Sequence, residues 1–156
     1  MTTTLLFVGK TTDPHIEALC QAYLKRLTHY LPLKVVIIPE LRNTKALTPE
    51  QQKQAEGELI LRAVPQRAEF ILLDEHGREY RSIEFAQQMQ KKMSSGRDIF
   101  FVIGGPYGFS QSVYDRANGK VSLSQMTFSH QMVRLFLIEQ IYRAMTILRG
   151  EPYHHE

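Results

Sequence analysis

Short runs of apolar residues alternate along the chain with longer segments in which apolar residues recur every three or four positions. The short runs, at residues 4–8, 33–38, 70–73 and 99–103, have the length of β-strands, and residues 121–123 can form a last strand. The longer segments have the spacing of amphipathic helices. Because the strand runs are continuously apolar, they are typical of a parallel sheet covered on both faces. We therefore predict an α/β fold, a mostly parallel sheet with helices on both faces.

Capping residues mark the starts of two helices. Asp13 followed by Pro14, and Thr48 followed by Pro49, are N-cap and first-turn pairs. Glycine and proline end the segments but gather in no linker, so we expect a single domain over residues 1–156. The predicted helices cover residues 14–27, 49–64, 82–96, 110–117 and 129–149.

The predicted helix over residues 129–149 differs from the others because its apolar residues leave no clean polar face. Placed at about 100° per residue, they surround the helix axis. One side of such a helix can cover its own sheet, but in so short a chain the opposite side needs a further cover. A second copy of the chain is the simplest cover, so we expect a homodimer whose interface uses this helix.

Composition excludes several classes of protein. The 19 Lys and Arg against 16 Asp and Glu give a formal charge of +3, which permits an acidic partner but does not require one. The single cysteine, Cys20, excludes an internal disulfide and a thiolate cluster, and no histidines have metal-ligand spacing, so we expect no metal. No apolar run is long enough to cross a membrane and none follows a basic leader, so we expect no membrane association and a cytoplasmic protein.

Two loops are candidates for ligand binding. The sequence GGPYG at residues 104–108 follows an apolar strand, and ligands of α/β sheets bind at the carboxyl ends of strands. Its glycines allow a ligand close to the backbone, although an ordinary tight turn has the same composition, and neither a Walker phosphate loop nor a GxGxxG spacing is present. The sequence LSQMTF at residues 123–128 can read the edge of an adenine through its backbone while Leu and Met cover the faces, or can simply connect a strand to the last helix.

The carboxyl-terminal tail, GEPYHHE at residues 150–156, concentrates aromatic and imidazole groups. Chain ends usually fray and rarely carry so many groups able to stack on a base or exchange a proton. Because the tail lies beyond the stop at Gly150, we expect it to contribute little to the core.

Two pairs of polar residues lie on the last helix at a spacing of four. His130 and Arg134 share one face, and Glu139 and Arg143 repeat the spacing with opposite charges. Such pairs are either modest surface ion pairs or, on a helix this apolar, part of a site or an interface.

The chain resembles the SPOUT family of ribosomal RNA pseudouridine N3-methyltransferases in three segments: FVIGGPYGFS, LSQMTFSHQMVRLFLIEQIYRA and the terminal PYHHE. The opening strand ending in VG, the strand FILLDEHG and the total length match as well, so essentially the whole chain is covered. The resemblance implies a homodimeric enzyme that uses S-adenosylmethionine to methylate N3 of a pseudouridine in large-subunit ribosomal RNA, on the assembled ribosome. It also implies a deep trefoil knot in the carboxyl-terminal part, an exception to the rule that folds avoid knots.

Matching positions carry the family's site residues onto this chain. Tyr153 and His154 match a terminal Tyr-His that helps to build the RNA site across the dimer, whereas His155 stands where some members have Arg. The cofactor-binding residues implied by the resemblance are Leu73, Gly104, Gly105, Leu123, Ser124, Gln125, Met126, Thr127 and Phe128.

Methyl transfer requires the two reactants to be aligned and the proton of a weakly acidic imide nitrogen to be removed. We expect Tyr153 and His154 to position the base or handle the proton, with His130, Arg134 and Glu139 as further members of the catalytic site. No residue stands out as the general base. Two rival functions stay open at this point: an inert module that binds RNA or the ribosome, and a protein that binds flavin or a nucleotide.

Overall fold

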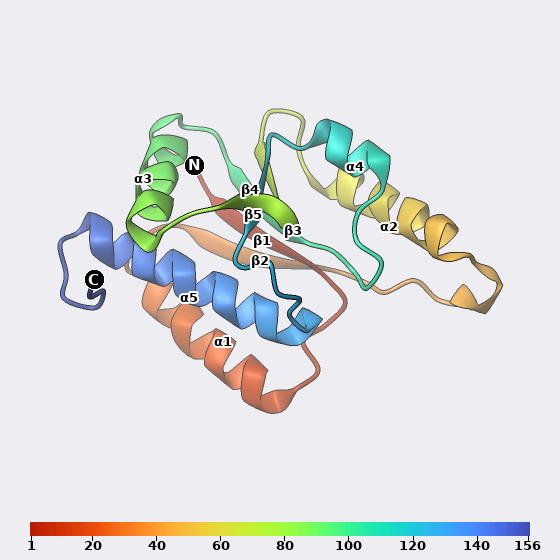
Figure 1. Cartoon of the computed structure of the whole chain (residues 1–156), viewed down its shortest axis with the longest axis horizontal. Helices are drawn as coiled ribbons and strands as arrows, with labels where there is room; N and C mark the ends of the chain where they lie inside the picture. The colour runs from red at the N-terminus through yellow and green to blue at the C-terminus, as the bar shows by residue number, and fades with distance from the viewer.

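The computed structural model describes residues 1–156 as an open sheet of five parallel strands with helices on both faces (Figure 1). This confirms the predicted α/β class, while the trefoil knot stays a prediction of the resemblance. The sheet contains β1 (Thr3–Val8), β2 (Leu33–Ile38), β3 (Glu69–Glu79), β4 (Ile99–Ile103) and β5 (Gly119–Ser122), in the order β2-β1-β4-β3-β5. The helices are α1 (Pro14–Leu27), the short 3₁₀ helix η1 (Thr44–Ala46), α2 (Pro49–Ala63), α3 (Ser82–Ser94), α4 (Gln111–Arg116) and α5 (His130–Leu148).

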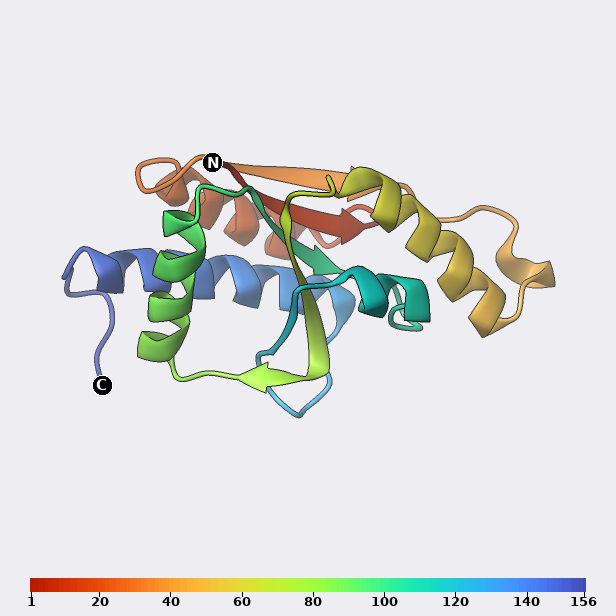
Figure 2. The same ribbon diagram turned by 90° about the horizontal axis from the view of Figure 1, so that it is seen from above.

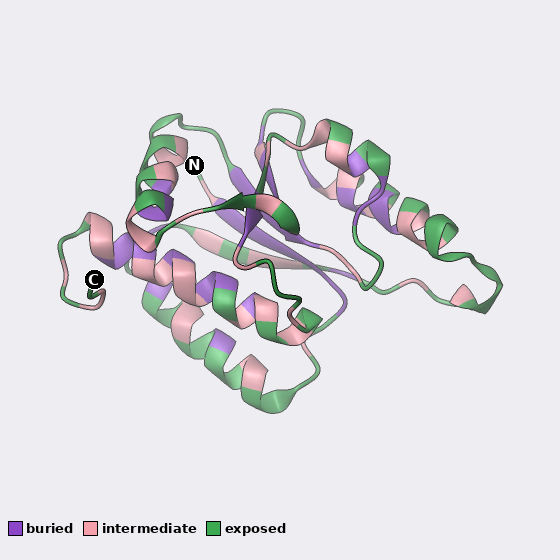
Figure 3. Ribbon diagram, in the orientation of Figure 1, coloured by how far each residue is buried: buried purple, intermediate pink, exposed green.

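The sheet separates two apolar cores, because successive side chains of a strand point to opposite faces. In β1, Leu5 and Phe7 pack with residues of α1, α3 and α5, whereas Leu6 and Val8 pack with residues of α2 and α4. Figure 2 shows the helices on both sides of the sheet, and Figure 3 shows that the central strands β1 and β4 are buried along their whole length. Burial on both faces explains the continuously apolar strand sequences.

The predicted capping residues begin the helices as expected. The Asp13 side chain accepts a hydrogen bond from the amide of His15 at 2.8 Å, and Pro14 is the first helical residue. Thr48 and Gln51 form a reciprocal capping box at the start of α2. Ser129, which is not among the predicted caps, also accepts from the amide of Met132 at 3.0 Å and begins α5.

Strand β3 is longer than the apolar run at residues 70–73 predicts. It continues through a polar stretch to Glu79, because after an irregularity it pairs again with β5 at Arg78 and Val121. Gly77 makes this second pairing possible, since a Cβ atom there would lie 2.7 Å from the carbonyl carbon of Lys120. Backbone pairing, rather than apolar side chains, defines this half of the strand.

Helix α5 lies between α1 and α3 on one face of the sheet (Figure 1). Its residues Leu137 and Ile141 are fully buried in the core of a single chain, so much of its apolar surface is covered without a partner. Met132 and Phe136, on the opposite side, are 37% and 39% exposed. None of the helices is both long enough and apolar enough to cross a membrane.

Candidate functional site

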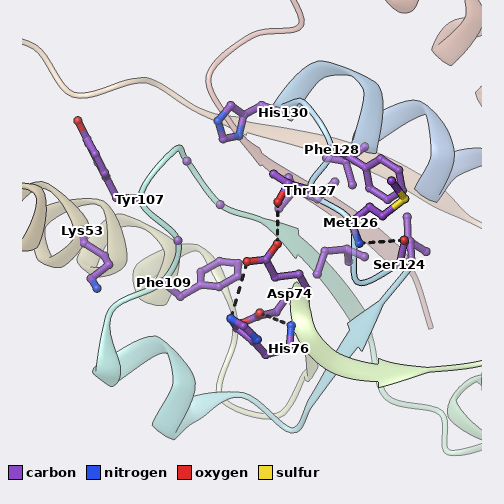
Figure 4. Close-up of a pocket in the computed structure, with 18 of the residues that line it drawn as sticks. Lys53, Asp74, His76, Tyr107, Phe109, Ser124, Met126, Thr127, Phe128 and His130 are labelled. Atoms are coloured by element: carbon purple, nitrogen blue, oxygen red, sulfur yellow. Dashed lines mark hydrogen bonds and ion pairs between the residues drawn. The ribbon is translucent and has the colours of Figure 1, made fainter.

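A cleft of about 410 Å³ opens at the carboxyl ends of β4 and β5 and beside the middle of β3, where its first pairing with β5 ends (Figure 4). Leu73 and Asp74 lie at this point of β3, the glycine loop follows β4, and the segment before α5 follows β5. These segments are far apart in the sequence, and the parallel sheet brings their ends to one edge. Ligands of open parallel sheets bind at this edge.

Most of the cofactor-binding residues implied by the resemblance line this cleft. Gln125, which is exposed, does not line the cleft. His130, at the start of α5, also lines the cleft and is exposed at its edge (Figure 4). The predicted residues that line the cleft are Leu73, Gly104, Gly105, Leu123, Ser124, Met126, Thr127 and Phe128.

The glycine loop, residues 104–109, is packed too closely for side chains at its first two positions. A Cβ atom on Gly104 would lie 2.8 Å from the Phe109 ring, and one on Gly105 would lie 2.5 Å from a carboxylate oxygen of Glu56. Gly108 has a positive φ of 80°, a conformation that favours glycine. The glycine loop is therefore more than a turn: its backbone packs closely against the side chains of Phe109 and Glu56.

Short-range hydrogen bonds shape the loop at residues 123–128. The Ser124 hydroxyl accepts a hydrogen bond from the amide of Met126 at 3.0 Å, and the backbone carbonyl of Ser124 accepts one from the Ser122 hydroxyl at 2.8 Å. Thr127 donates to a carboxylate oxygen of Glu75 at 3.1 Å, which connects this loop to β3 (Figure 4). The Met126 side chain is 76% exposed at the cleft, so it is available to a ligand.

Asp74 and Glu75 place two carboxyl groups on the cleft wall. Asp74 accepts hydrogen bonds from the amide of His76 at 2.9 Å and from the Tyr114 hydroxyl. Burial and the bond to Asp74 raise the pKa of Tyr114, which therefore stays a neutral donor. None of these four residues is predicted from the sequence, although Asp74 directly follows an apolar strand run and so stands where α/β sites form.

The carboxyl-terminal tail is folded back onto α1 and α5 rather than frayed. None of its residues belongs to either apolar core, as the sequence predicts. The Tyr153 hydroxyl donates to Glu139 at 2.9 Å and lies 3.2 Å from that of Tyr23. Glu139 also accepts from Arg143 at 2.6 Å, and Arg143 lies 3.1 Å from Nδ1 of His154. The pair formed by Glu139 and Arg143 thus organises the tail.

The cleft lies at the start of α5 and the tail follows its end. Figure 1 shows how far apart these two ends of the helix are. His130 lines the cleft at the start of the helix, whereas Arg143 contacts the tail about 20 Å further along at the usual helical rise. Tyr153, His154 and Glu139 are therefore separated from the cleft of their own chain.

Arg134 lies outside the cleft although it shares a helix with His130. Its guanidinium is 2% exposed and donates to the carbonyls of Val8 at 2.8 Å and Gly9 at 2.9 Å, and to the Thr11 hydroxyl at 3.0 Å. Through these bonds Arg134 connects α5 to the carboxyl end of β1 and to the loop that follows it. Burial lowers the pKa of its guanidinium.

The side chains offer neither a metal-binding cluster nor a reactive thiol. No three His, Cys, Asp or Glu side chains lie close enough together to hold a metal ion. Cys20 is buried, and desolvation raises the pKa of its thiol to about 11. A thiol with so high a pKa is a poor nucleophile at neutral pH.

A parallel sheet with a cleft formed by a glycine loop and by the segment before the last helix defines an α/β protein with a candidate ligand site at the carboxyl ends of its strands. The chain belongs to the family described as "Predicted SPOUT methyltransferase", whose model matches residues 1–154. It is 56% identical to the ribosomal RNA large subunit methyltransferase H of Bacteroides fragilis, over the full length of both proteins. It is 54% identical to the protein of the same name from Flavobacterium johnsoniae, over 97% of this chain and 98% of that protein.

Proposed function

We propose that this protein is a homodimeric enzyme that transfers a methyl group from S-adenosylmethionine to N3 of a pseudouridine in large-subunit ribosomal RNA, on the assembled ribosome. The observation that carries the proposal is the meeting of Leu73, the glycine loop and residues 123–128 in one cleft. The names of the relatives from Bacteroides and Flavobacterium, which cover essentially the whole chain, support the same reaction and substrate class.

The cleft suits S-adenosylmethionine in size and chemistry. Its volume of about 410 Å³ falls within the range of about 300–1,000 Å³ typical of small-molecule sites. Leu123, Met126 and Phe128 offer apolar surfaces for an adenine, and the loop backbone offers hydrogen bonds to its edge. Asp74 and Glu75 provide negative charge for a cationic ligand. When bound, this cofactor supplies an electrophilic methyl group on a positively charged sulfur.

In this proposal the tail of each chain completes the RNA site at the cleft of the partner chain. Within one chain the two are separated by most of the length of α5, so Tyr153 and His154 cannot reach a base held at their own cleft. The exposed side chains of Met132 and Phe136 lie on α5 near the cleft, where the Phe136 ring packs 5.2 Å from that of Phe128. An antiparallel pairing of two α5 helices would cover these apolar groups and bring each tail to the other cleft.

His154 acts as a hydrogen-bond donor in this arrangement. The Arg143 guanidinium is always charged and can only donate, so Nδ1 of His154 accepts from it and the proton of the neutral ring is on Nε2. This Nε2 is buried, lies 3.4 Å from Glu156 in the tail and has no hydrogen-bond partner of good geometry. It can donate to a carbonyl oxygen of the target base once Glu156 moves aside and uncovers it.

Glu139 and Tyr153 position the other groups. Both Glu139 oxygens already accept hydrogen bonds, one from Arg143 and Tyr153 and the other from Gln140, so this carboxylate is not free to take a proton from the base. The Arg143 guanidinium lies 4.8 Å from the centre of the Tyr153 ring, which holds both side chains in place. The donor on His154 stabilises the anion formed when the imide proton passes to water.

Calorimetric titration of the purified protein with S-adenosylmethionine, FMN and ATP tests the cofactor. Binding of S-adenosylmethionine alone supports the proposal, and binding of FMN or ATP in its place refutes it. The methylation itself is tested on ribosomes from cells that lack the gene, by the mass of the nucleosides released after incubation with enzyme and cofactor. Ribosome binding without any gain of methyl groups would identify an inert binding module instead.

A further inference from the structure

Glu56 is a buried carboxyl group behind the glycine loop. It belongs to α2, is 6% exposed, and accepts a hydrogen bond from the backbone amide of Gly105 at 2.8 Å. Glu56 does not itself line the cleft, whereas Gly105 does. The carboxyl group therefore contacts the wall of the cleft from the outer side.

Gly57, the next residue, brings α2 equally close to the far end of the loop. A Cβ atom at Gly57 would collide with the Ser110 hydroxyl and lie 3.2 Å from a methyl group of Val113. Ser110 is the N-cap of α4 and accepts from the amide of Val113. Two consecutive residues of α2 thus contact the glycine loop near its start and just after its end.

A carboxyl group in this place costs folding free energy. No lysine, arginine or histidine lies within ion-pair distance of Glu56, and the carboxylate of Glu40, which follows β2, repels it. Burial raises the pKa of Glu56, with the bond from Gly105 acting in the opposite direction. An apolar side chain of similar volume would avoid this cost, so the contribution of Glu56 lies in the hydrogen bond that it accepts.

The bond from Gly105 fixes the orientation of one peptide group. In a trans peptide the N–H and the preceding C=O point in opposite directions. Because the Gly105 N–H is directed at Glu56, outside the cleft, the Gly104 carbonyl is directed to the opposite side, where the cleft lies. A ligand with an amino group or another donor can then bind to this carbonyl.

We propose that Glu56 is a positioning residue for the cofactor, which holds the peptide between Gly104 and Gly105 so that the Gly104 carbonyl accepts a hydrogen bond from the bound ligand. The residue acts through the loop and contacts no reacting atom. The identity of the ligand, S-adenosylmethionine, rests on the proposed function, whereas the orientation of the peptide does not.

Substitutions at Glu56 and at its exposed neighbour Glu58 test this role. Glu56→Leu removes the acceptor at similar volume and should weaken the affinity for S-adenosylmethionine about tenfold, the equivalent of one hydrogen bond. Glu56→Gln keeps an acceptor oxygen at the same reach and should restore an affinity close to that of the wild type. Glu58→Leu makes the same change on the solvent side of α2, so its affinity should not change.

Hydrogen exchange of the Gly105 amide gives a second measurement that needs no ligand. The amide should be protected in the wild type and in Glu56→Gln, and should exchange faster in Glu56→Leu and in Glu56→Asp, whose side chain is one methylene shorter. Glu56→Asp also replaces Glu56→Leu in the affinity test if the leucine variant does not fold.

The outcomes separate this inference from the proposed function. A folded Glu56→Leu protein, or its Asp substitute, with wild-type affinity would overturn the positioning role, as would a lowered melting temperature without a change in affinity. A Gly105 amide that exchanges freely in the wild type would overturn it as well. A wild-type protein that binds no S-adenosylmethionine would refute the proposed function, and the exchange rates of Gly105 would still decide whether Glu56 holds the loop.

Discussion

At the scale of single residues, the buried carboxyl group of Glu56 should make stability depend on pH. Because burial raises its folded-state pKa above the ordinary value, the folded protein binds this proton more tightly than the unfolded chain does. The resulting stabilisation is complete below the ordinary pKa and is lost as the pH rises through the folded-state pKa. Glu56→Gln should therefore be more stable than the wild type at neutral pH, with a difference that shrinks in mild acid.

Urea unfolding of the two proteins over this pH range measures the difference. Glu58→Gln, which removes an exposed carboxyl group of the same helix, serves as the matched control and should follow the wild type throughout. A constant difference between wild type and Glu56→Gln at all pH values would mean that the Glu56 carboxyl group does not titrate differently on folding.

The two histidines of the tail should differ in importance. His154 is part of the network formed by Arg143 and Glu139, whereas His155 is exposed and makes no hydrogen bond. His154→Ala should lower single-turnover methylation of ribosomes by about tenfold to a hundredfold, the effect of losing a hydrogen bond to a charged transition state. His155→Ala should have a much smaller effect. Equal losses in both variants would contradict the role given to His154.

At the scale of elements, neighbouring residues of α5 should respond oppositely to the same substitution. Phe136 is 39% exposed, and Asp at this position should separate the proposed dimer into folded monomers. Leu137 is fully buried between the sheet and the helices, so Leu137→Asp should cost about 3–5 kcal/mol and unfold the chain. Sedimentation velocity and circular dichroism distinguish the two results. A wild-type protein that sediments as a monomer at micromolar concentration would refute the dimer.

Deletion of the tail should affect both stability and turnover. Without residues 153–156 the chain loses the hydrogen bonds of Tyr153 to Glu139 and Tyr23, so the melting temperature should fall by a few degrees, about 4 °C for each kcal/mol lost. Affinity for S-adenosylmethionine should be retained, because Leu73, the glycine loop and residues 123–128 form the cofactor cleft without the tail, while methylation of ribosomes should be lost. Loss of cofactor affinity in the truncated protein would place the tail in the cofactor site.

The sequence predicts elements well where local signals define them. The capping residue Asp13 and the apolar strand runs gave helices and strands with nearly correct bounds. The second half of β3 escaped prediction, because residues 74–79 carry polar side chains and are held by backbone pairing with β5. The resemblance located most of the cleft, and Asp74 could have been found because it directly follows an apolar strand run. Glu56 contacts the cleft wall only through the packing of α2 against the glycine loop, which no local pattern encodes.

At the scale of the whole molecule, the proposed exchange of tails between partners predicts complementation. A cleft variant such as Gly105→Val, whose added side chain would collide with Glu56, and a variant without residues 153–156 should each be inactive. Random mixing after unfolding and refolding gives about half mixed dimers, each with one intact pair of cleft and tail, so about a quarter of wild-type activity should return. No recovery in a mixture shown to contain mixed dimers would mean that cleft and tail act within one chain.

The central place of α5 between α1 and α3 also governs how a newly made chain can fold. Synthesis proceeds from the amino terminus, yet the core on this face of the sheet is completed only by Leu137, Ile138 and Ile141 near the end of the chain. Until these residues leave the translating ribosome, the strands and the first helices expose apolar surface, which chaperones bind. Nascent chains stalled before α5 should therefore be degraded by added protease, whereas chains released after their last residue should resist it.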